Sequence, residues 1–411
     1  MWYPWLEAQR DLMQSISNCA MLGYDVWTLP AMSCTPVAAA GYDWLYRLVR
    51  PPPEPPPFGI PVVTVGDRSV PVVERVVDST PFCALRQFMR APTPVAPRRG
   101  QNCTAPPDIF LCAPLAGHHA VMLRETVETL LQDGDVYVTD WANARNVPLA
   151  AGRFGLDDYV LALERFLRKL DCAHTHVIAV CQATAPTLAA AALLARQGEA
   201  PPLSLTLMGG PIDTRLNPTA VDRLAQSHSL DWFRGTVIET VPPRYVGSGR
   251  RVCPGFIQHA AIVATHPHRQ LALELRYWSS RLSADATAIA NSLRSLNEYA
   301  AALDMTEDYL LDTIRVIFQE QHLAHGEWRV GGSCVQPQDL ASMALCTVEG
   351  DRDDIAGAGQ THAAHALCSA IPVQKRCHWT ISDCDHYDLF TGPRWHEVIH
   401  PAVVRFWASV R

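Results

Sequence analysis

The sequence lacks several features that would place it in a membrane, nucleic-acid or nucleotide-binding class. It has no run of eighteen apolar residues, so we expect no membrane span. It has no basic cluster, and its net charge of -7 gives no reason to expect a nucleic-acid partner. No phosphate-cradling loop or dinucleotide fingerprint is present.

Cysteine and histidine are numerous but do not form metal-binding patterns. The thirteen cysteines include no C-x-x-C pair, and the first residues lack the basic region of a secretory signal. We therefore predict a reducing, cytoplasmic compartment in which most thiols are buried and inert. The closely spaced histidine pairs are not joined by a carboxylate or a cysteine in a ligand arrangement, so we predict no metal and no cofactor.

What the sequence does have is a regular alternation of apolar strands and helices. Strands are predicted at residues 109–113, 135–139, 177–180 and 203–208, with helices at 120–132, 156–170 and 182–197. Further strands are predicted at 344–348 and 377–381, followed by a helix over 395–410. A strand–helix alternation of this kind predicts an α/β fold with a mostly parallel central sheet flanked by helices.

Four regions follow from this pattern. Residues 1–57 form an N-terminal helical segment and a proline-rich linker, and residues 58–212 form the first part of the core, beginning with a hairpin and a third strand. Residues 213–342 are predicted to be a helical cap inserted between core strands, with helical segments at 220–233, 258–264, 269–282 and 286–318. Residues 343–411 complete the core. The aromatic side chains of Trp2, Tyr3 and Trp5 either pack on the body or dock on an apolar surface, and we favour packing.

The most informative stretch is the junction of the 177–180 strand and the 182–197 helix. Cys181 stands between them, with the small residues Ala179 and Ala183 two positions away on either side. This spacing is typical of a nucleophile elbow, a turn so tight that its flanking positions must be small. A structural cysteine at a strand end is the alternative interpretation.

A cysteine nucleophile needs a base and a group that orients the base. The turn after the 344–348 strand contains three aspartates, of which we choose Asp353, with Asp354 as the alternative. The loop after the last strand contains His386, so the chain order is nucleophile, acid, base, as in α/β-hydrolases.

The remaining site residues lie near the first core strands. The backbone N–H of Gln182 and that of Leu115 or Ala116 are predicted to form the oxyanion hole. We assign His118, His119, Asp140 and Trp141 to substrate binding, although the two histidines could instead cap the following helix.

With these residues in view, the chain resembles the bacterial intracellular poly(3-hydroxybutyrate) depolymerases. The resemblance is carried by the segments at residues 1–9, 112–120, 136–141, 180–182, 208–213, 249–256, 311–315, 348–360 and 384–387. It implies an α/β-hydrolase fold, a cysteine in place of the usual serine, and hydrolysis of stored polyester at the granule surface without a cofactor. It places the triad on Cys181, Asp353 and His386, and a homodimer stays open.

Two other functions compete with this interpretation. A synthase-like acyltransferase would share the acyl-cysteine but pass the acyl group to a polymer hydroxyl instead of water. Such synthases normally keep glycines around the nucleophile, which this sequence lacks. A non-catalytic granule-coat protein would need no ordered cysteine, aspartate and histidine.

Overall fold

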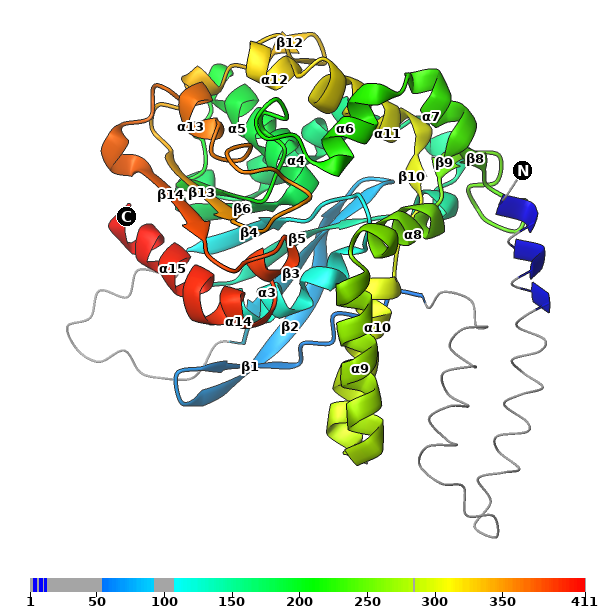
Figure 1. Ribbon diagram of the computed structural model, residues 1–411. Helices are drawn as coiled ribbons and strands as arrows, with labels where there is room; N and C mark the ends of the chain where they lie inside the picture. Colours follow the sequence, from blue (N-terminus) through cyan, green and yellow to red (C-terminus); the bar gives the residue numbers. More distant parts are fainter. Residues whose placement is uncertain are drawn as a thin grey trace.

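A computed structural model describes residues 3–5, 7–9, 11–12, 54–91, 107–283 and 285–410 of the chain. Within these residues a nine-stranded sheet crosses the molecule in the order β1-β2-β3-β5-β4-β6-β7-β13-β14, as Figure 1 shows. Its strands are β1 (Val62–Val65), β2 (Arg68–Ser79), β3 (Cys83–Arg90), β4 (Asp108–Cys112), β5 (Val136–Trp141), β6 (Thr175–Val180), β7 (Ser204–Met208), β13 (Ala344–Gly350) and β14 (Arg376–Ile381).

The sheet has a parallel part and an antiparallel part. The six strands from β5 to β14 run parallel to one another. The N-terminal strands β1, β2 and β3 extend the sheet in antiparallel fashion beyond β5, as the predicted hairpin and third strand require. The predicted α/β-hydrolase fold, with its mostly parallel sheet, is confirmed.

Helices cover both faces of the sheet, and the sequence of β6 explains why. Successive strand residues point to opposite faces, so Val177 and Ala179 pack in one core and Ile178 and Val180 in the other. The first core contains residues of α4 (Leu156–Lys169) and α5 (Thr184–Arg196). The second contains residues of α3 (Arg124–Leu130) and α15 (His400–Ser409). A strand buried on both faces is expected to be mainly apolar, and residues 177–180 of β6 are, while the buried His176 at its start has its Nδ1 2.7 Å from Ser204 Oγ.

The segment between β7 and β13 forms the cap, but it is not purely helical. Its helices are α6 (Ala220–Ser227), α7 (Leu230–Thr236), α8 (Gly255–Thr265), α9 (Pro267–Ser283), α10 (Ala286–Ala300), α11 (Glu307–Thr313) and α12 (His322–His325). Between them lie a small sheet of β8 (Glu239–Thr240), β9 (Arg251–Cys253) and β10 (Met305–Thr306), and the hairpin of β11 (Arg329–Val330) and β12 (Ser333–Cys334).

The long helix predicted over residues 286–318 is wrong for a physical reason. The chain leaves α10 and passes through β10 before α11 begins. At the break, the buried Asp304 carboxylate accepts hydrogen bonds from the backbone N–H of Gly255, at 2.8 Å, and from the Tyr3 hydroxyl, at 2.6 Å. These buried bonds tie the chain to two distant segments and hold it out of the helical path.

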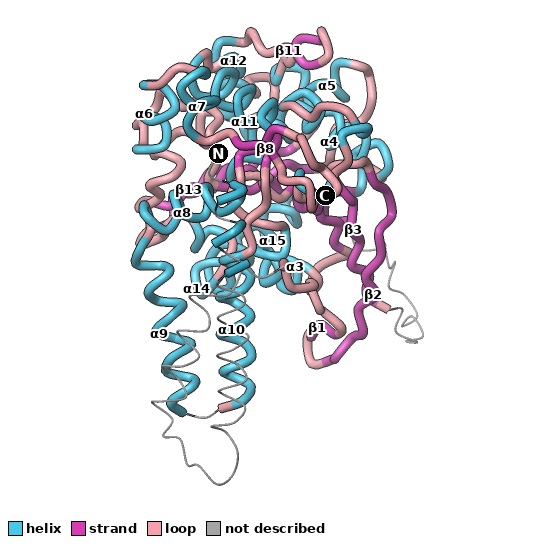
Figure 2. Tube along the Cα trace, turned by 90° about the vertical axis from the view of Figure 1, so that its right-hand side faces the viewer, coloured by secondary structure: helices cyan, strands magenta, loops and turns pink. Residues whose placement is uncertain are grey.

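Helices α9 and α10 form a hairpin that projects away from the body, as the two views in Figures 1 and 2 agree. Its two helices meet through the hydroxyls of Ser280 and Ser292, 2.8 Å apart, and through the buried side chains of Tyr277 and Leu296. None of the helices in the described ranges is both long enough and apolar enough to cross a membrane.

The two described aromatic residues at the N-terminus differ in their packing on the body. Tyr3 is fully buried and packs edge-on against Tyr245 and Phe256. Trp5 is 55% exposed. Trp2 and residues 13–53 lie outside the described residues, so the predicted N-terminal helices there are not described further.

Candidate active site

Cys181 occupies a sharp turn between β6 and α5. Its φ of 54° is in the left-handed region, which is unfavourable for a residue other than glycine unless the surroundings hold it there. The buried Ala179 and Ala183 leave room for the turn, and the Thr184 hydroxyl donates to the Cys181 carbonyl at 2.8 Å. The half-buried Cys181 therefore has the backbone geometry of a nucleophile elbow.

The neighbouring strand end leaves no space for side chains beside this turn. A Cβ on Gly210 would lie 1.8 Å from Thr184 Oγ1 and 2.5 Å from the Cys181 carbonyl oxygen. A Cβ on Gly209, whose φ is 55°, would lie 3.1 Å from Asp353 Oδ2. The two glycines that follow β7 thus allow the three predicted triad segments to approach one another.

His386 contacts both other residues of the predicted triad. Its Nδ1 lies 2.8 Å from Asp353 Oδ2, and it hydrogen-bonds with the Cys181 side chain. Burial alone lowers the pKa of His386, but the charges of Asp353 and Cys181 and its hydrogen bonds to them raise that pKa well above its usual value. This environment favours the protonated imidazole, the form that accompanies a cysteine thiolate.

The structure separates the two aspartates that the sequence left as alternatives. Asp353 is buried, and its Oδ1 accepts the backbone N–H groups of Ile355 and Ala356, each at 2.9 Å. The Asp354 side chain is 56% exposed and its Oδ1 lies 2.5 Å from His266 Nε2. Of the two carboxylates, only that of Asp353 contacts His386 among the described residues.

The predicted oxyanion loop lies against the elbow. The Ala116 N–H donates to Gln182 Oε1 at 2.9 Å, so the Gln182 side chain fastens the loop to the turn. Among the described residues, no acceptor is recorded for the N–H of Leu115. The next amide, that of Gly117, donates to Gln258 Oε1 at 3.0 Å.

Three of the four residues assigned to substrate binding meet in a cavity of about 460 Å³ that no triad residue lines. They are His119, Asp140 and Trp141. Asp140 pairs with Arg86 at 2.5 Å, and the buried Trp141 donates its Nε1–H to the Ala113 carbonyl at 2.9 Å. These contacts give Asp140 and Trp141 structural partners in the core.

The fourth residue, His118, lies elsewhere. It is buried, with its ring centroid 5.1 Å from that of Tyr299 and 6.0 Å from that of Tyr387, the residue after His386. Burial lowers the pKa of His118 to about 3, so its imidazole is neutral at physiological pH. Its packing places it beside the predicted base and not at a helix cap.

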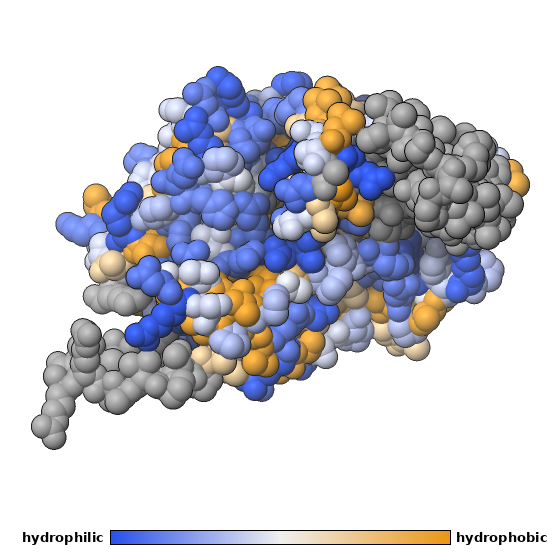
Figure 3. All heavy atoms as spheres, turned by 90° about the horizontal axis from the view of Figure 1, so that it is seen from below, coloured by the Kyte–Doolittle hydropathy of each residue, from blue (hydrophilic) through white to orange (hydrophobic). Residues whose placement is uncertain are grey.

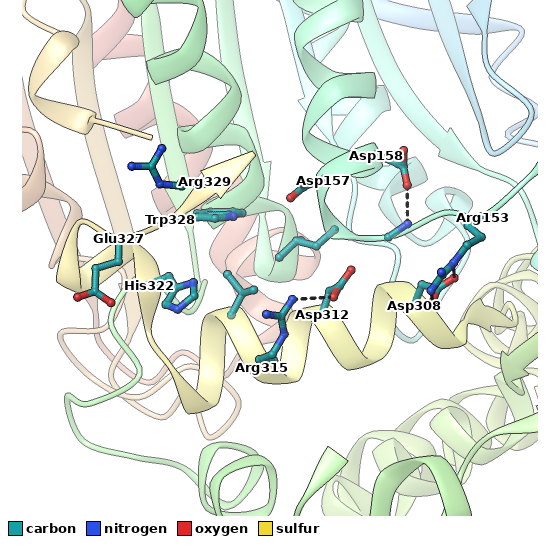
Figure 4. A pocket seen from close by; sticks show the side chains of 13 residues that line it. Arg153, Asp157, Asp158, Asp308, Asp312, Arg315, His322, Glu327, Trp328 and Arg329 are labelled. Carbon is teal, nitrogen blue, oxygen red and sulfur yellow. Dashed lines mark hydrogen bonds and ion pairs between the residues drawn. The ribbon is translucent and has the colours of Figure 1, made fainter. Parts of the chain in front are cut away.

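A further cavity, of about 450 Å³, opens between the start of α4 and helix α11. Figure 4 shows that charged side chains surround it. Arg153 pairs with Asp308 at 3.0 Å and Arg315 with Asp312 at 3.1 Å, so much of its charge is compensated internally. No residue of the predicted triad lines it. Nowhere in the described ranges, this cavity included, is there a group of three or more histidine, cysteine, aspartate or glutamate side chains that could hold a metal ion.

The cap contributes residues that the sequence did not reveal. Gln258 of α8 holds the oxyanion loop through Gly117, and its own Nε2 donates to the carbonyls of Cys253 and Leu303. Arg269 of α9 stacks its guanidinium 4.2 Å from the ring centroid of Tyr387. Both residues act across long sequence separations, so no local pattern marks them.

Comparison with known families identifies the C-terminal part. Residues 209–411 match the family model described as "PHB de-polymerase C-terminus". This part of the chain is therefore similar to the C-terminal part of PHB de-polymerases. The match begins just after β7, so it includes Asp353 and His386, while Cys181 precedes it. The chain is an ester hydrolase.

Several distant hydrolases of known structure resemble the chain, and none of the curated proteins matches it. Carboxyl esterase 2 from the fungus Tuber melanosporum is 12% identical, with a TM-score of 0.42 over 83% of this chain and 88% of that one. A monoacylglycerol lipase from Paleococcus ferrophilus is 12% identical, with a TM-score of 0.44 over 75% and 97%. The RedJ thioesterase from Streptomyces coelicolor is 16% identical, with a TM-score of 0.41 over 76% and 91%.

Proposed function

We propose that the chain hydrolyses the ester bonds of stored amorphous poly(3-hydroxybutyrate) to 3-hydroxybutyrate oligomers or monomers, through a triad of Cys181, His386 and Asp353. The observation that carries the proposal is the position of His386, which bonds a buried carboxylate at 2.8 Å and the thiol of a strained elbow. The family match supplies the polyester as substrate class.

In the proposed first step, His386 takes the Cys181 proton and the thiolate attacks the ester carbonyl. Asp353 keeps Nδ1 of the imidazole protonated, which leaves the other ring nitrogen free for the thiol proton. His386 then gives that proton to the departing hydroxyl end of the polymer, which leaves a hydroxyacyl thioester on Cys181. Water activated by His386 cleaves the thioester and releases the acid.

The tetrahedral oxyanion needs two donors. We assign them to the backbone N–H of Gln182 and that of Leu115, because the Ala116 N–H already donates to Gln182 Oε1. We further propose that the enzyme acts in the cytoplasm on polymer granules. The described cysteines are all free, which suits a reducing compartment.

The test is to incubate the protein with amorphous polymer and titrate the released acid, with Cys181→Ala as the control. Release of acid without coenzyme A, lost in the control, supports hydrolysis and argues against a synthase-like acyltransferase. Binding to polymer with no acid release from wild type would instead favour a granule-coat protein and overturn the proposal.

A further inference from the structure

The projecting hairpin carries an apolar stripe on its outer side. Leu271, Leu275 and Leu282 of α9 are 58%, 60% and 57% exposed, and the half-buried Trp278 lies between them. At about 100° per residue, these four positions fall within a sector of about 60° on the helix. We call this set the α9 stripe. Figure 3 views the molecule from below and shows hydrophobic patches among hydrophilic residues on this face.

The hairpin does not need this stripe for its own packing. Its inner face is made by Tyr277 and Ser280 of α9, which meet Ser292 and Leu296 of α10. On the helix, the centre of the stripe lies about 130° from Tyr277 and about 170° from Ser280. An exposed run of leucines that no other described element covers marks a contact surface.

The N-terminal end of α9 contacts the two loops that carry Asp353 and His386. His266, just before α9, bonds Asp354, the neighbour of Asp353. Arg269 in the first turn stacks on Tyr387, the neighbour of His386, and donates to Thr391 Oγ1 at 3.3 Å.

The stripe therefore starts close to the site. It begins two positions after Arg269 and ends within about 20 Å of it, at a rise of about 1.5 Å per residue. A surface that covered the stripe would adjoin the catalytic loops.

The size and chemistry of the stripe indicate what covers it. Three half-exposed leucines and one indole amount to about a few hundred Å², well short of the ~800 Å² per partner that a stable dimer buries. The stripe itself carries no charge. An uncharged apolar strip beside the catalytic loops suits an extended, uncharged polyester surface better than a second copy of the chain.

We propose that the α9 stripe docks the enzyme on the surface of amorphous polyester, next to the active site. This inference rests on the proposed function for its substrate. Docking raises the local concentration of ester at the catalytic loops, while a soluble ester reaches the site without it.

The experiment compares two triple variants of the full-length chain. Leu271→Gln/Leu275→Gln/Leu282→Gln removes the three leucines of the stripe, leaves Trp278 in place and keeps helix propensity. Leu161→Gln/Val246→Gln/Val373→Gln removes three exposed apolar residues elsewhere and serves as the matched control. Binding is measured by co-sedimentation with amorphous poly(3-hydroxybutyrate) particles in a Cys181→Ala background, and rates are measured on these particles and on a soluble 3-hydroxybutyrate trimer.

We expect the stripe variant to bind particles at least tenfold more weakly and to hydrolyse them correspondingly slowly. Its rate on the trimer and its melting temperature should stay near those of wild type, as should all properties of the control. A Leu→Ala version of the stripe variant, with a smaller loss, provides the test if the glutamine version is destabilised.

Three results would overturn the proposal. They are unchanged particle binding, an equal loss of activity on the trimer in a folded variant, and a wild-type dimer that the variant converts to monomer in light scattering. Because binding is measured without catalysis, it decides the docking question even if wild type hydrolyses neither substrate and the proposed function fails.

Discussion

Replacement of Asp353 by asparagine probes the proposed triad most directly, because its carboxylate has three described donors. Oδ1 accepts from Ile355 and Ala356, each at 2.9 Å, and Oδ2 accepts from His386 Nδ1 at 2.8 Å. An asparagine that keeps its oxygen on the two amides turns its NH₂ group toward His386. The imidazole must then accept at Nδ1, which puts its proton on the nitrogen that should receive the Cys181 proton.

The alternative asparagine orientation is the more costly one. It would keep the His386 bond but leave two buried amides without an acceptor, at about 1–3 kcal/mol each. We therefore expect the wrong tautomer to dominate and kcat to fall by about 10³–10⁴, which corresponds to about 4–5.5 kcal/mol. Loss of the Asp353 charge also lowers the pKa of His386, so the limb of the pH profile that His386 controls should move to lower pH.

The assay is steady-state hydrolysis of a soluble 3-hydroxybutyrate trimer over a range of pH, with the melting temperature as a check of folding. Asp354→Asn is the matched control, because its exposed side chain reaches only His266 among the described residues. We expect it to keep most of the activity. Wild-type activity in Asp353→Asn, or an equal loss in both variants, would refute the assignment of the acid.

Three further predictions concern stability and the elbow. Cys181→Ala should abolish turnover with little change in melting temperature, because a small residue replaces a small one; residual turnover above background contradicts the nucleophile. Gly210→Ala should lower both activity and melting temperature, because its Cβ would lie 1.8 Å from Thr184 Oγ1, whereas Gly235→Ala meets nothing within 4 Å and should be near neutral. Burial lowers the pKa of His118 from 6.5 to about 3, so the unfolded chain binds a proton in this window that the folded chain does not. The free energy of unfolding should then fall as pH drops below 6.5, by up to about 1.4 kcal/mol per pH unit. Urea unfolding of His118→Phe at several pH values should show a weaker dependence of this free energy on pH. An equal pH dependence in the variant and in wild type would show that His118 does not cause the loss.

The core could be predicted from sequence because its signals are local. Residues 177–180 of β6 form a continuous apolar run, and the small residues around Cys181 mark the turn that follows it. The choice between Asp353 and Asp354 needed the structure, because burial and partners separate two adjacent carboxylates that look alike in sequence.

The cap was predicted less well because the signals that determine its structure are not local. Its strands are only two or three residues long, too short for a period to show. The helix expected over residues 286–318 has helical composition, and it is broken by Asp304, whose partners lie far away in the chain. Gln258 and Arg269 reach the catalytic loops only once the cap has folded onto the core.

The position of the cap within the chain has a consequence for biosynthesis. Translation produces Cys181 and its elbow before the cap, and Asp353 and His386 only after it. Strand β14, at the edge of the sheet, pairs with β13 and must do so before His386 can reach the thiol. A nascent chain, or one that a protease has shortened by its last strand and helix, therefore displays the thiol without its base. Under the proposed mechanism such a chain should not hydrolyse esters, and activity should appear only after β14 and the loop that carries His386 have folded onto the sheet.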